Sequence, residues 1–289
     1  MLKDFPRFKV DEKSKEYEEL LHYTNLDVLG IILRDKTLKL NSIKNLNDRL
    51  EQKRKGIERF TPNFYVSSFC HYPHEIVPFW FMYGGNRNKE KILLRFKNFA
   101  NTFENTFFDD WAITSEGKIL YFDVRNLFHD GGSGISINPK KDPTIESRQT
   151  VSKVRMFDII YKPASDEVFL NSYRKSSEIS FDDGKSFISL PMQDLRTVGK
   201  YKTVNWEYEA ETRVQCMMNI LDNCFFDFLL LRFKDEAFRD LNIVANPWAS
   251  DEFIQEIEEK VKTSDLPKKI KDTIRVVRSE LDGQIIEME

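Results

Sequence analysis

The sequence lacks the features that mark secreted and membrane proteins. It has three cysteines in 289 residues, at spacings that form no disulfide framework, and no Asn-x-Ser/Thr acceptor for glycans. Residues 1–20 alternate charges with single apolar residues and contain no apolar core of a signal peptide. The longest apolar run, at 225–231, is interrupted by Asp227 and is too short to span a bilayer. We therefore expect a soluble cytoplasmic protein with no membrane partner.

An excess of charge of one sign is also missing. The 44 lysines and arginines nearly balance the 47 acidic residues, which leaves a net charge of -3 and no global field for nucleic acid or an acidic membrane surface. Disorder is excluded because 40% of the residues are hydrophobic. Aromatic residues are abundant, with 24 Phe, 10 Tyr and 4 Trp. They predict a Phe-rich interior or a cleft lined by rings.

Short apolar segments predict an α+β protein. Segments rich in β-branched and aromatic residues predict strands at 20–23, 63–70, 91–96, 151–161, 206–214, 225–233 and 241–246. Glu116-Gly117 predicts a hairpin turn, and 129–144 has the composition of a flexible loop. Because the strands cluster along the chain instead of alternating regularly with helices, we expect mixed, mainly antiparallel sheets with flanking helices.

Helical spacing of apolar residues predicts several helices. One begins after Thr24 or Asn25, either of which can cap it. Others are predicted at 97–108, with a stripe of phenylalanines, and at 165–176, 250–262 and 266–280. We expect a single domain over residues 1–289, with an inserted segment at about 97–150 and a C-terminal helical region at about 250–289.

The segment 206–214 has strict period-two alternation and is the most informative part of the chain. On a strand, one face would carry Glu207, Glu209, Glu211 and Arg213, spaced roughly 7 Å apart. Like charges on one face repel, so the pattern costs stability unless the groups are solvated or used. Two interpretations stay open. Either this is a solvent face on which Arg213 pairs with an acid, or a carboxylate is fixed in a cleft while Arg213 positions a neighbour or binds phosphate.

Other motifs point less clearly to chemistry. Cys70, His71 and His74 could ligate zinc, but no second ligand pair follows, so no metal is expected. The glycines at 131–134 fit neither a dinucleotide fingerprint nor a P-loop. The basic residues between 53 and 59 predict a solvated helix face or a contact to a phosphate backbone. No nucleophile elbow is present.

Six short motifs follow one another along the chain. They are His22-Tyr23-Thr24 before an apolar helix, Leu38-Lys39-Leu40, Asn47-Asp48-x-x-Glu51, a strand ending Ser67-Ser68-Phe69, Trp80-x-x-Tyr83 and Trp206-x-Tyr208-Glu209-x-Glu211-x-Arg213. Their order and spacing resemble the bacterial domain-of-unknown-function family 2971 over about residues 20–280. Arg49 stands where that family usually has proline, and the inserted segment has no counterpart.

The same layout is similar, more distantly, to the ADP-ribosyltransferase superfamily. In that superfamily a first-strand His or Arg, a middle-strand Ser or Tyr and a late-strand Glu surround NAD. The resemblance implies that His22, with Thr24 beside it, holds the ribose or phosphates of NAD. It also implies that Ser67 or Ser68 supports the nicotinamide pocket. For His22 the alternative is a satisfied buried histidine.

The resemblance assigns the acidic and aromatic residues as well. Glu211 would be the catalytic acid, with Glu209 the competing choice and Arg213 beside them. Four rings would stack on nicotinamide or adenine, or else pack in the core: Tyr23, Phe69, Trp80 and Tyr83.

The function implied by the resemblance is an NAD-consuming ADP-ribosyltransferase. NAD would be the co-substrate, the acceptor a nucleic acid or a protein, and the setting a toxin or phage defence with an antitoxin or defence partner. Two alternatives stay open. One is a non-catalytic module of the same fold that binds a nucleotide, nucleic acid or protein, and the other is an NAD glycohydrolase with no acceptor.

Overall fold

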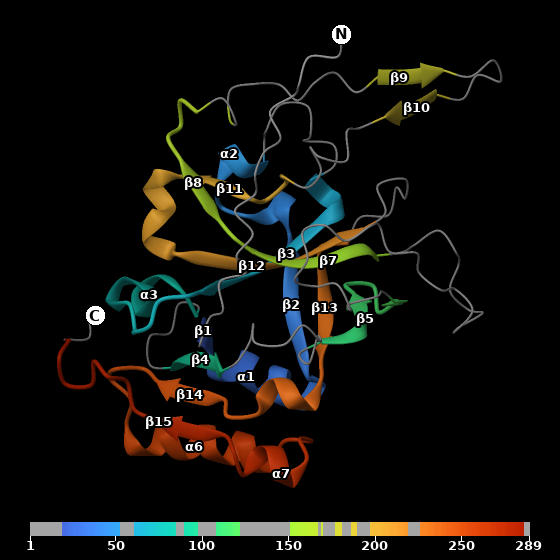
Figure 1. Cartoon of the computed structure of the whole chain (residues 1–289). Helices are drawn as coiled ribbons and strands as arrows, with labels where there is room; N and C mark the ends of the chain where they lie inside the picture. The colour runs from blue at the N-terminus through green and yellow to red at the C-terminus, as the bar shows by residue number, and fades with distance from the viewer. Residues whose placement is uncertain are drawn as a thin grey trace.

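The fold combines a large mixed sheet with flanking helices (Figure 1). A computed structural model describes residues 19–52, 61–84, 90–97, 108–121, 151–166, 169, 177–180, 186–189, 197–218 and 226–285. Within these residues, eleven strands form one mainly antiparallel sheet in the order β15-β14-β4-β1-β3-β2-β13-β5-β6, with β12 paired to β3 and β7. The predicted α+β class is therefore confirmed.

The elements have the following bounds. The large sheet contains β1 (Glu19–Asn25), β2 (Thr37–Ser42), β3 (Phe64–Cys70), β4 (Lys91–Lys97), β5 (Phe108–Thr114), β6 (Ile119–Tyr121), β7 (Val151–Asp158), β12 (Glu211–Met218), β13 (Phe228–Phe233), β14 (Asn242–Ala245) and β15 (Arg275–Val277). Two small sheets pair β8 (Ile160–Lys162) with β11 (Tyr201–Thr203) and β9 (Ser177–Ser180) with β10 (Ser186–Ser189). The α-helices are α1 (Leu26–Asp35), α2 (Arg49–Gln52), α3 (Val77–Met82), α6 (Asp251–Thr263) and α7 (Lys268–Lys271). The 3-10 helices are η1 (Ile43–Asn45), η2 (Thr61–Asn63), η5 (Val204–Glu209) and η6 (Asp235–Phe238).

Strand β3 is the centre of the sheet and has three neighbours. One edge contacts β1 at Cys70 and β2 at Tyr65 and Val66, while the other edge pairs with β12 along its whole length. Strands β12 and β7 run across β2 and β13 in Figure 1, so the sheet bends around β3. This arrangement places residues from three distant parts of the sequence side by side.

Helix α1 forms as the sequence predicts. Asn25 caps it, since the side-chain Oδ1 accepts a hydrogen bond of 2.9 Å from the Val28 N–H. The Asn25 amide also donates to the carbonyl of Gly84 at 3.1 Å. Gly84 has a φ of +84°, and a Cβ there would lie 2.4 Å from the Thr24 carbonyl oxygen, so glycine is required. The buried face of α1 consists of Leu26, Leu29, Ile32 and Leu33.

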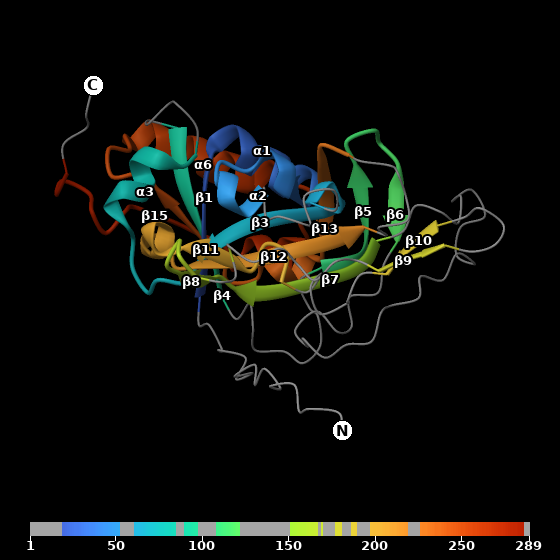
Figure 2. The same cartoon turned by 90° about the horizontal axis from the view of Figure 1, so that it is seen from above.

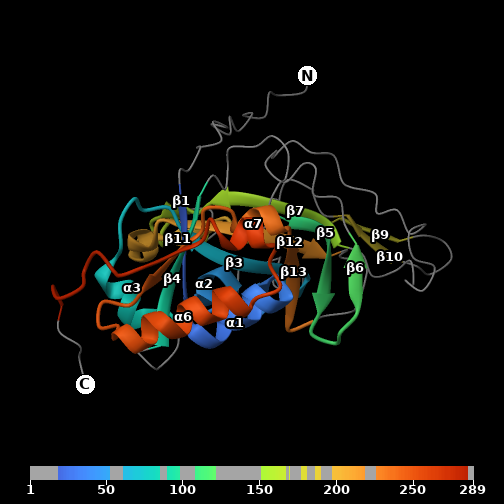
Figure 3. The ribbon, with the colours of Figure 1, turned by 90° about the horizontal axis from the view of Figure 1, so that it is seen from below.

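The two longest described helices lie beside each other. Figure 3 shows α1 along α6, and Figure 2 shows both on the same side of β3, β12 and β7. The groove between them has a volume of about 300 Å³ and is lined in part by Gly30, Arg34 and Lys260. None of the described helices is long and apolar enough to cross a membrane.

The predicted Phe-rich interior is confirmed. The Phe233 ring lies 5.7 Å from the Phe96 ring, 5.1 Å from Phe108 and 5.4 Å from Phe238, measured between centroids. All four side chains are buried in the main apolar cluster. The phenylalanine stripe predicted at 97–108 lies outside the described residues, apart from Lys97 at the end of β4 and Phe108 at the start of β5.

Two element predictions are wrong. Residues 206–209 belong to the 3-10 helix η5 instead of a strand, and β12 begins at Glu211. The turn between them is made by Ala210, which has a left-handed φ of 39°. The helix predicted at 266–280 ends at residue 271, because the β-branched residues that follow pair with the free edge of β14 as strand β15.

The remaining element predictions are confirmed, confirmed in part, or lie outside the described residues. Strands at 20–23, 63–70, 91–96, 225–233 and 241–246 are confirmed, as are the hairpin at Glu116-Gly117 and the helix at 250–262. The segment predicted as one strand at 151–161 contains β7 and the start of β8. The loop at 129–144 and most of the helix at 165–176 lie outside the described residues. Within the inserted segment, β5 and β6 belong to the large sheet through β13.

Candidate functional site

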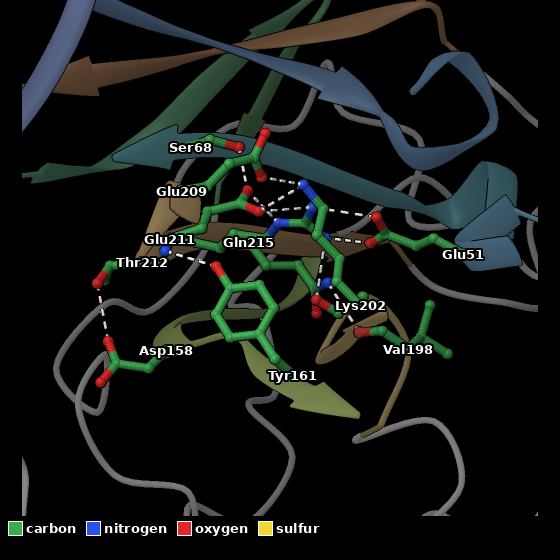
Figure 4. A network of polar contacts seen from close by, with 12 residues as sticks. Glu51, Ser68, Asp158, Tyr161, Val198, Lys202, Glu209, Glu211, Thr212 and Gln215 are labelled. Carbon is green, nitrogen blue, oxygen red and sulfur yellow. Dashed lines mark hydrogen bonds and ion pairs between the residues drawn. The ribbon is translucent and has the colours of Figure 1, made fainter. Parts of the chain in front are cut away.

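Five charged side chains form one cluster, and Figure 4 labels four of them: Glu51, Lys202, Glu209 and Glu211. This buried charge cluster consists of Glu51, Lys202, Glu209, Glu211 and Arg213, each less than a tenth exposed. They come from α2, β11, η5 and β12. Three carboxylates against two cations leave the cluster with a net charge of -1. Buried charges are stable only when they are paired and hydrogen-bonded, so each member depends on the others.

The strand register explains why these side chains meet. Glu211 lies opposite Cys70 in β3, and Arg213 lies opposite Ser68. Directly opposite residues of an antiparallel pair project to the same face, so Ser68, Glu211 and Arg213 share one side of the sheet. The turn at Ala210 then brings Glu209 back to the same side, where it contacts the ammonium group that also binds Glu211.

Arg213 is the most rigidly fixed member of the cluster. Its Nε donates to Glu211 at 2.5 Å, and its Nη2 donates to Glu51 at 3.0 Å and to Glu211 at 3.2 Å. Its Nη1 donates to the other oxygen of Glu51 and, at 3.0 Å, to the carbonyl of Gly199. Burial alone would lower the pKa of Arg213, but the two carboxylates raise it. The guanidinium thus locks two acids from separate elements into one geometry.

Gly199 is required at this contact. It has a φ of +72°, and a Cβ would lie 2.7 Å from Nε2 of Gln215 and 2.8 Å from Cδ1 of Ile43. Gln215 in turn donates to the carbonyl of Val198 at 3.1 Å. The chain before β11 therefore packs closely against β12. This close packing brings Lys202 of β11 into the cluster.

Glu211 is an ionised carboxylate with every acceptor position used. Arg213 Nε and the Ser68 hydroxyl donate to Oε1, while Arg213 Nη2 and Lys202 donate to Oε2. Burial would raise the pKa of Glu211, but Arg213 and Lys202 lower it to about 2. Of the three residues that donate hydrogen bonds to Glu211, Ser68 is the exposed one. The Ser68 hydroxyl therefore links the buried Glu211 to an exposed residue of β3.

Glu209 is bound by fewer donors and lies beside a group of rings. The Tyr83 hydroxyl donates to one oxygen and Lys202 donates to the other at 2.6 Å. The Phe79 ring lies 5.0 Å from Tyr83 and 6.3 Å from Tyr208, which is 40% exposed. Burial and the neighbouring carboxylate raise the pKa of Tyr83, so its hydroxyl stays a donor. These rings form an aromatic wall next to the carboxylate.

Two further rings predicted for the site are part of the core. Trp80 is fully buried, and its indole N–H donates to Glu75 at 3.0 Å. The Tyr23 ring lies 5.1 Å from Trp80, and its hydroxyl accepts a hydrogen bond of 2.9 Å from the Ile76 N–H. The Trp80 ring thus packs in the core as part of helix α3, which also carries Phe79 of the aromatic wall, and the Tyr23 ring packs against it.

Four predicted residues lie on the other face of the sheet. Because Leu21 is opposite Cys70, the side chain of His22 projects away from Glu211, and Thr24 follows it. Ser67 and Phe69 alternate with Ser68 and share that opposite face. The His22 and Phe69 rings are 5.1 Å apart. The structure therefore brings together Ser68, Tyr83, Glu209, Glu211 and Arg213, and separates them from His22, Thr24, Ser67 and Phe69.

His22 is a neutral ring with a satisfied hydrogen bond. Its Nδ1 lies 3.0 Å from the carbonyl oxygen of Ser68. A carbonyl can only accept, so Nδ1 carries the proton and Nε2 is the unprotonated nitrogen. Burial lowers the pKa of His22, although the hydrogen bond to Ser68 acts in the opposite direction. This hydrogen bond thus connects His22 of β1 to the backbone of β3 at Ser68.

A second polar group occupies the same face as His22. The Thr212 hydroxyl donates to Asp158 at 2.7 Å, and the His71 Nδ1 lies 3.0 Å from the Thr212 oxygen. Across the described parts of the chain, no three His, Cys, Asp or Glu side chains are grouped so that they could hold a metal ion.

Two members of the cluster were missed by the sequence analysis as site residues. Glu51 belongs to a quoted motif, and Asp48 caps its short helix by accepting hydrogen bonds from the Leu50 N–H at 2.9 Å and the Glu51 N–H at 3.4 Å. That capping pattern could have shown that a short helix begins at this place, but not that Glu51 contacts Arg213. Lys202 lies in a short strand with no distinguishing pattern. Its place in the cluster is shown only by its ion pairs with Glu209 and Glu211 in the folded chain.

The ionisation of Glu211 predicts a pH dependence of stability. Its pKa is about 2 in the folded protein and 4.5 in a model peptide, so protonation favours the unfolded chain. The ionised group contributes about 3 kcal/mol above its unfolded pKa, and this contribution is lost as the pH falls from about 5 toward 2. Urea unfolding of wild type and Glu211→Gln should therefore differ less at acidic than at neutral pH. A difference independent of pH would show that the charge of Glu211 does not stabilise the fold.

Comparison of the chain with known protein families, with curated proteins and with solved structures gave no match.

Proposed function

We propose that the protein cleaves the nicotinamide glycosidic bond of NAD and transfers ADP-ribose to a nucleic acid or a protein. The observation that carries this proposal is Glu211, a buried carboxylate fixed at the start of a strand, kept ionised by two cations and hydrogen-bonded to the hydroxyl of the exposed residue Ser68. The resemblance to ADP-ribosyltransferases supports it, and implies a toxin or phage-defence setting in the cytoplasm.

The chemistry needs a fixed negative charge more than it needs an acid. When the bond between C1′ of the ribose and the nicotinamide nitrogen breaks, its electron pair leaves with nicotinamide and positive charge develops on the ribose. A carboxylate that faces this charge and accepts a hydrogen bond from the ribose stabilises the transition state more than the ground state. The acceptor nucleophile then bonds to C1′ and releases its proton. Glu211 is suited to this role because its low pKa keeps it charged.

The surrounding residues would bind and orient the substrate. The Ser68 hydroxyl marks the acceptor position on Glu211 that a ribose hydroxyl would take over. The aromatic wall of Tyr83, Tyr208 and Phe79 offers an apolar surface for a flat ring. Glu209 retains acceptor capacity next to this wall, which keeps it the competing choice for the catalytic acid.

A specific observation favours a second function. All four acceptor positions of Glu211 are filled by the protein's own donors, an arrangement that also suits a purely structural ion network. In that case the protein is a non-catalytic module that binds a nucleotide, nucleic acid or protein. The third alternative, an NAD glycohydrolase, shares the first step of the transferase but uses water as acceptor.

One experiment separates these functions. The purified protein is incubated with NAD labelled on the adenine, with and without cell lysate, and both free nicotinamide and labelled macromolecules are measured. A transferase gives nicotinamide and label on protein or nucleic acid, and treatment with protease or nuclease then identifies the acceptor class. A glycohydrolase gives nicotinamide without macromolecular label. A folded protein that gives neither product refutes the enzymatic proposal and leaves the binding module.

A further inference from the structure

The groove between α1 and α6 has space for a ligand and shares no residue with the buried charge cluster. Its volume of about 300 Å³ is at the lower end of the range of small-molecule sites. The residues that line it belong to α1 and to the C-terminal end of α6. A ligand bound here would therefore be independent of the cluster and of the function proposed for it.

The ammonium group of Lys260 lies in this groove without a counter-ion. The lysine stem crosses α1 at Gly30, where an added Cβ would lie 3.7 Å from Cδ and 3.2 Å from Nζ of the lysine. Within the part of the chain that the structure describes, no carboxylate oxygen lies within 4.0 Å of this Nζ and no acceptor is hydrogen-bonded to it. Lys260 is half-buried. A partly desolvated charge without a partner favours the approach of an anion.

The C-terminal end of α6 does not use the Lys260 ammonium as a cap. The Lys271 ammonium donates to the carbonyls of Lys262 and Ser264 at 2.9 and 3.1 Å. The hydroxyls of Thr263 and Ser264 donate to two further helix carbonyls, each at 2.7 Å. These are the groups to which a basic side chain near a helix C-terminus would otherwise donate. All donors of the Lys260 ammonium are therefore available to a ligand.

Gly30 keeps the floor of the groove open. It lies in the interior of α1, where glycine destabilises a helix relative to alanine. Its φ is outside the left-handed region, and the three atoms nearest to an added Cβ all belong to the flexible side chain of Lys260. Neither the backbone conformation nor a close approach of another backbone therefore requires glycine here. Beside it, Ile31 is 42% exposed and offers an apolar surface.

We propose that this groove binds a small organic molecule with one carboxylate, which pairs with Lys260 while its apolar part lies against Ile31. The other charged groups of the lining are already accommodated. Arg34 donates to the carboxylate of Asp35 at 2.7 and 2.8 Å. Asp27 lies in the first turn of α1, where the helix dipole favours a negative charge. Lys260 is thus the lining cation that lacks a partner, and one negative charge complements it.

The first test uses the full-length protein labelled with ¹⁵N, and hexanoate as the probe. Hexanamide is its neutral counterpart, and the ionic strength is kept constant. NMR follows the amide signal of Ile31 during each titration. We expect hexanoate to shift this signal in a saturable way with a Kd of about 1 mM, and hexanamide to bind at least about tenfold more weakly.

Two variants separate the contribution of the charge from that of the space. Lys260→Met removes the charge, keeps most of the stem and should weaken hexanoate binding at least about tenfold. Gly30→Leu keeps the charge but fills the floor of the groove with a good helix former, and should abolish binding. The matched control is Lys262→Met, which removes an exposed lysine of the same helix that pairs with Glu259, and it should bind as wild type does.

The NMR spectrum of each variant also shows whether it is folded, and Lys260→Met keeps the test informative if Gly30→Leu does not fold. The inference is overturned if hexanoate causes no saturable shift in the wild-type protein, or if hexanamide binds equally well. Wild-type affinity in folded Lys260→Met or Gly30→Leu overturns it as well. Because no step involves NAD or Glu211, these results are independent of the proposed function.

Discussion

Replacing Arg213 by methionine is expected to lower the free energy of unfolding by about 4 kcal/mol. The substitution keeps an apolar stem of similar length but leaves Glu51 and Glu211 buried without their shared guanidinium. Removing one partner of a buried ion pair is costly because the other charge stays desolvated. Urea or thermal unfolding measures the change directly.

Two controls show whether the loss comes from the cluster. Arg239→Met removes an arginine whose ion pair with Glu236 is solvent-exposed, and it should cost less than about 1 kcal/mol. Adding Glu51→Gln to Arg213→Met removes one of the two stranded charges and should recover part of the stability. An Arg213→Met protein as stable as the Arg239→Met protein would mean that the cluster does not support the fold.

The second large effect concerns catalysis. Glu211→Gln is expected to reduce the rate of nicotinamide release from NAD about a thousandfold, because the amide keeps the shape of the side chain but carries no charge to face the ribose. The matched control is Glu207→Gln, since Glu207 belongs to the same acidic motif but is exposed. That variant should retain the wild-type rate, measured by steady-state kinetics.

Glu209→Gln decides between the two candidate acids. Glu209 accepts hydrogen bonds from Tyr83 and Lys202 and lies next to the aromatic wall, so its loss should weaken substrate binding more than it slows the chemical step. The expected result is a raised KM with a smaller change in kcat. The opposite result, a thousandfold loss of kcat in Glu209→Gln and little loss in Glu211→Gln, would assign catalysis to Glu209.

Local patterns were sufficient to predict most of the elements. Strand β3 follows from its β-branched and aromatic residues, and α1 follows from the Asn25 cap and its apolar spacing. These signals depend only on residues close together in the sequence. The alternation of Glu209, Glu211 and Arg213 predicted one shared strand face, either in solvent or in a cleft, but Glu209 belongs to η5 and reaches the other two side chains through a turn.

The rest depends on contacts between distant segments. Glu51 meets Arg213 across 162 positions of the sequence, and Ser68 meets Glu211 across 143. Which face of the sheet carries His22 depends on the register of β1 against β3, and a shift of one residue would reverse it. Neither the register nor the partner of Lys202 is encoded by a local pattern, so the cluster was visible only in the folded chain.

The most direct test of the central claim is the rate of nicotinamide release from NAD by the wild-type protein and by Glu211→Gln, with folding of both confirmed by circular dichroism. The proposed function predicts steady release by wild type and a loss of about a thousandfold in the variant. Equal rates, or no release from the folded wild-type protein, would contradict it.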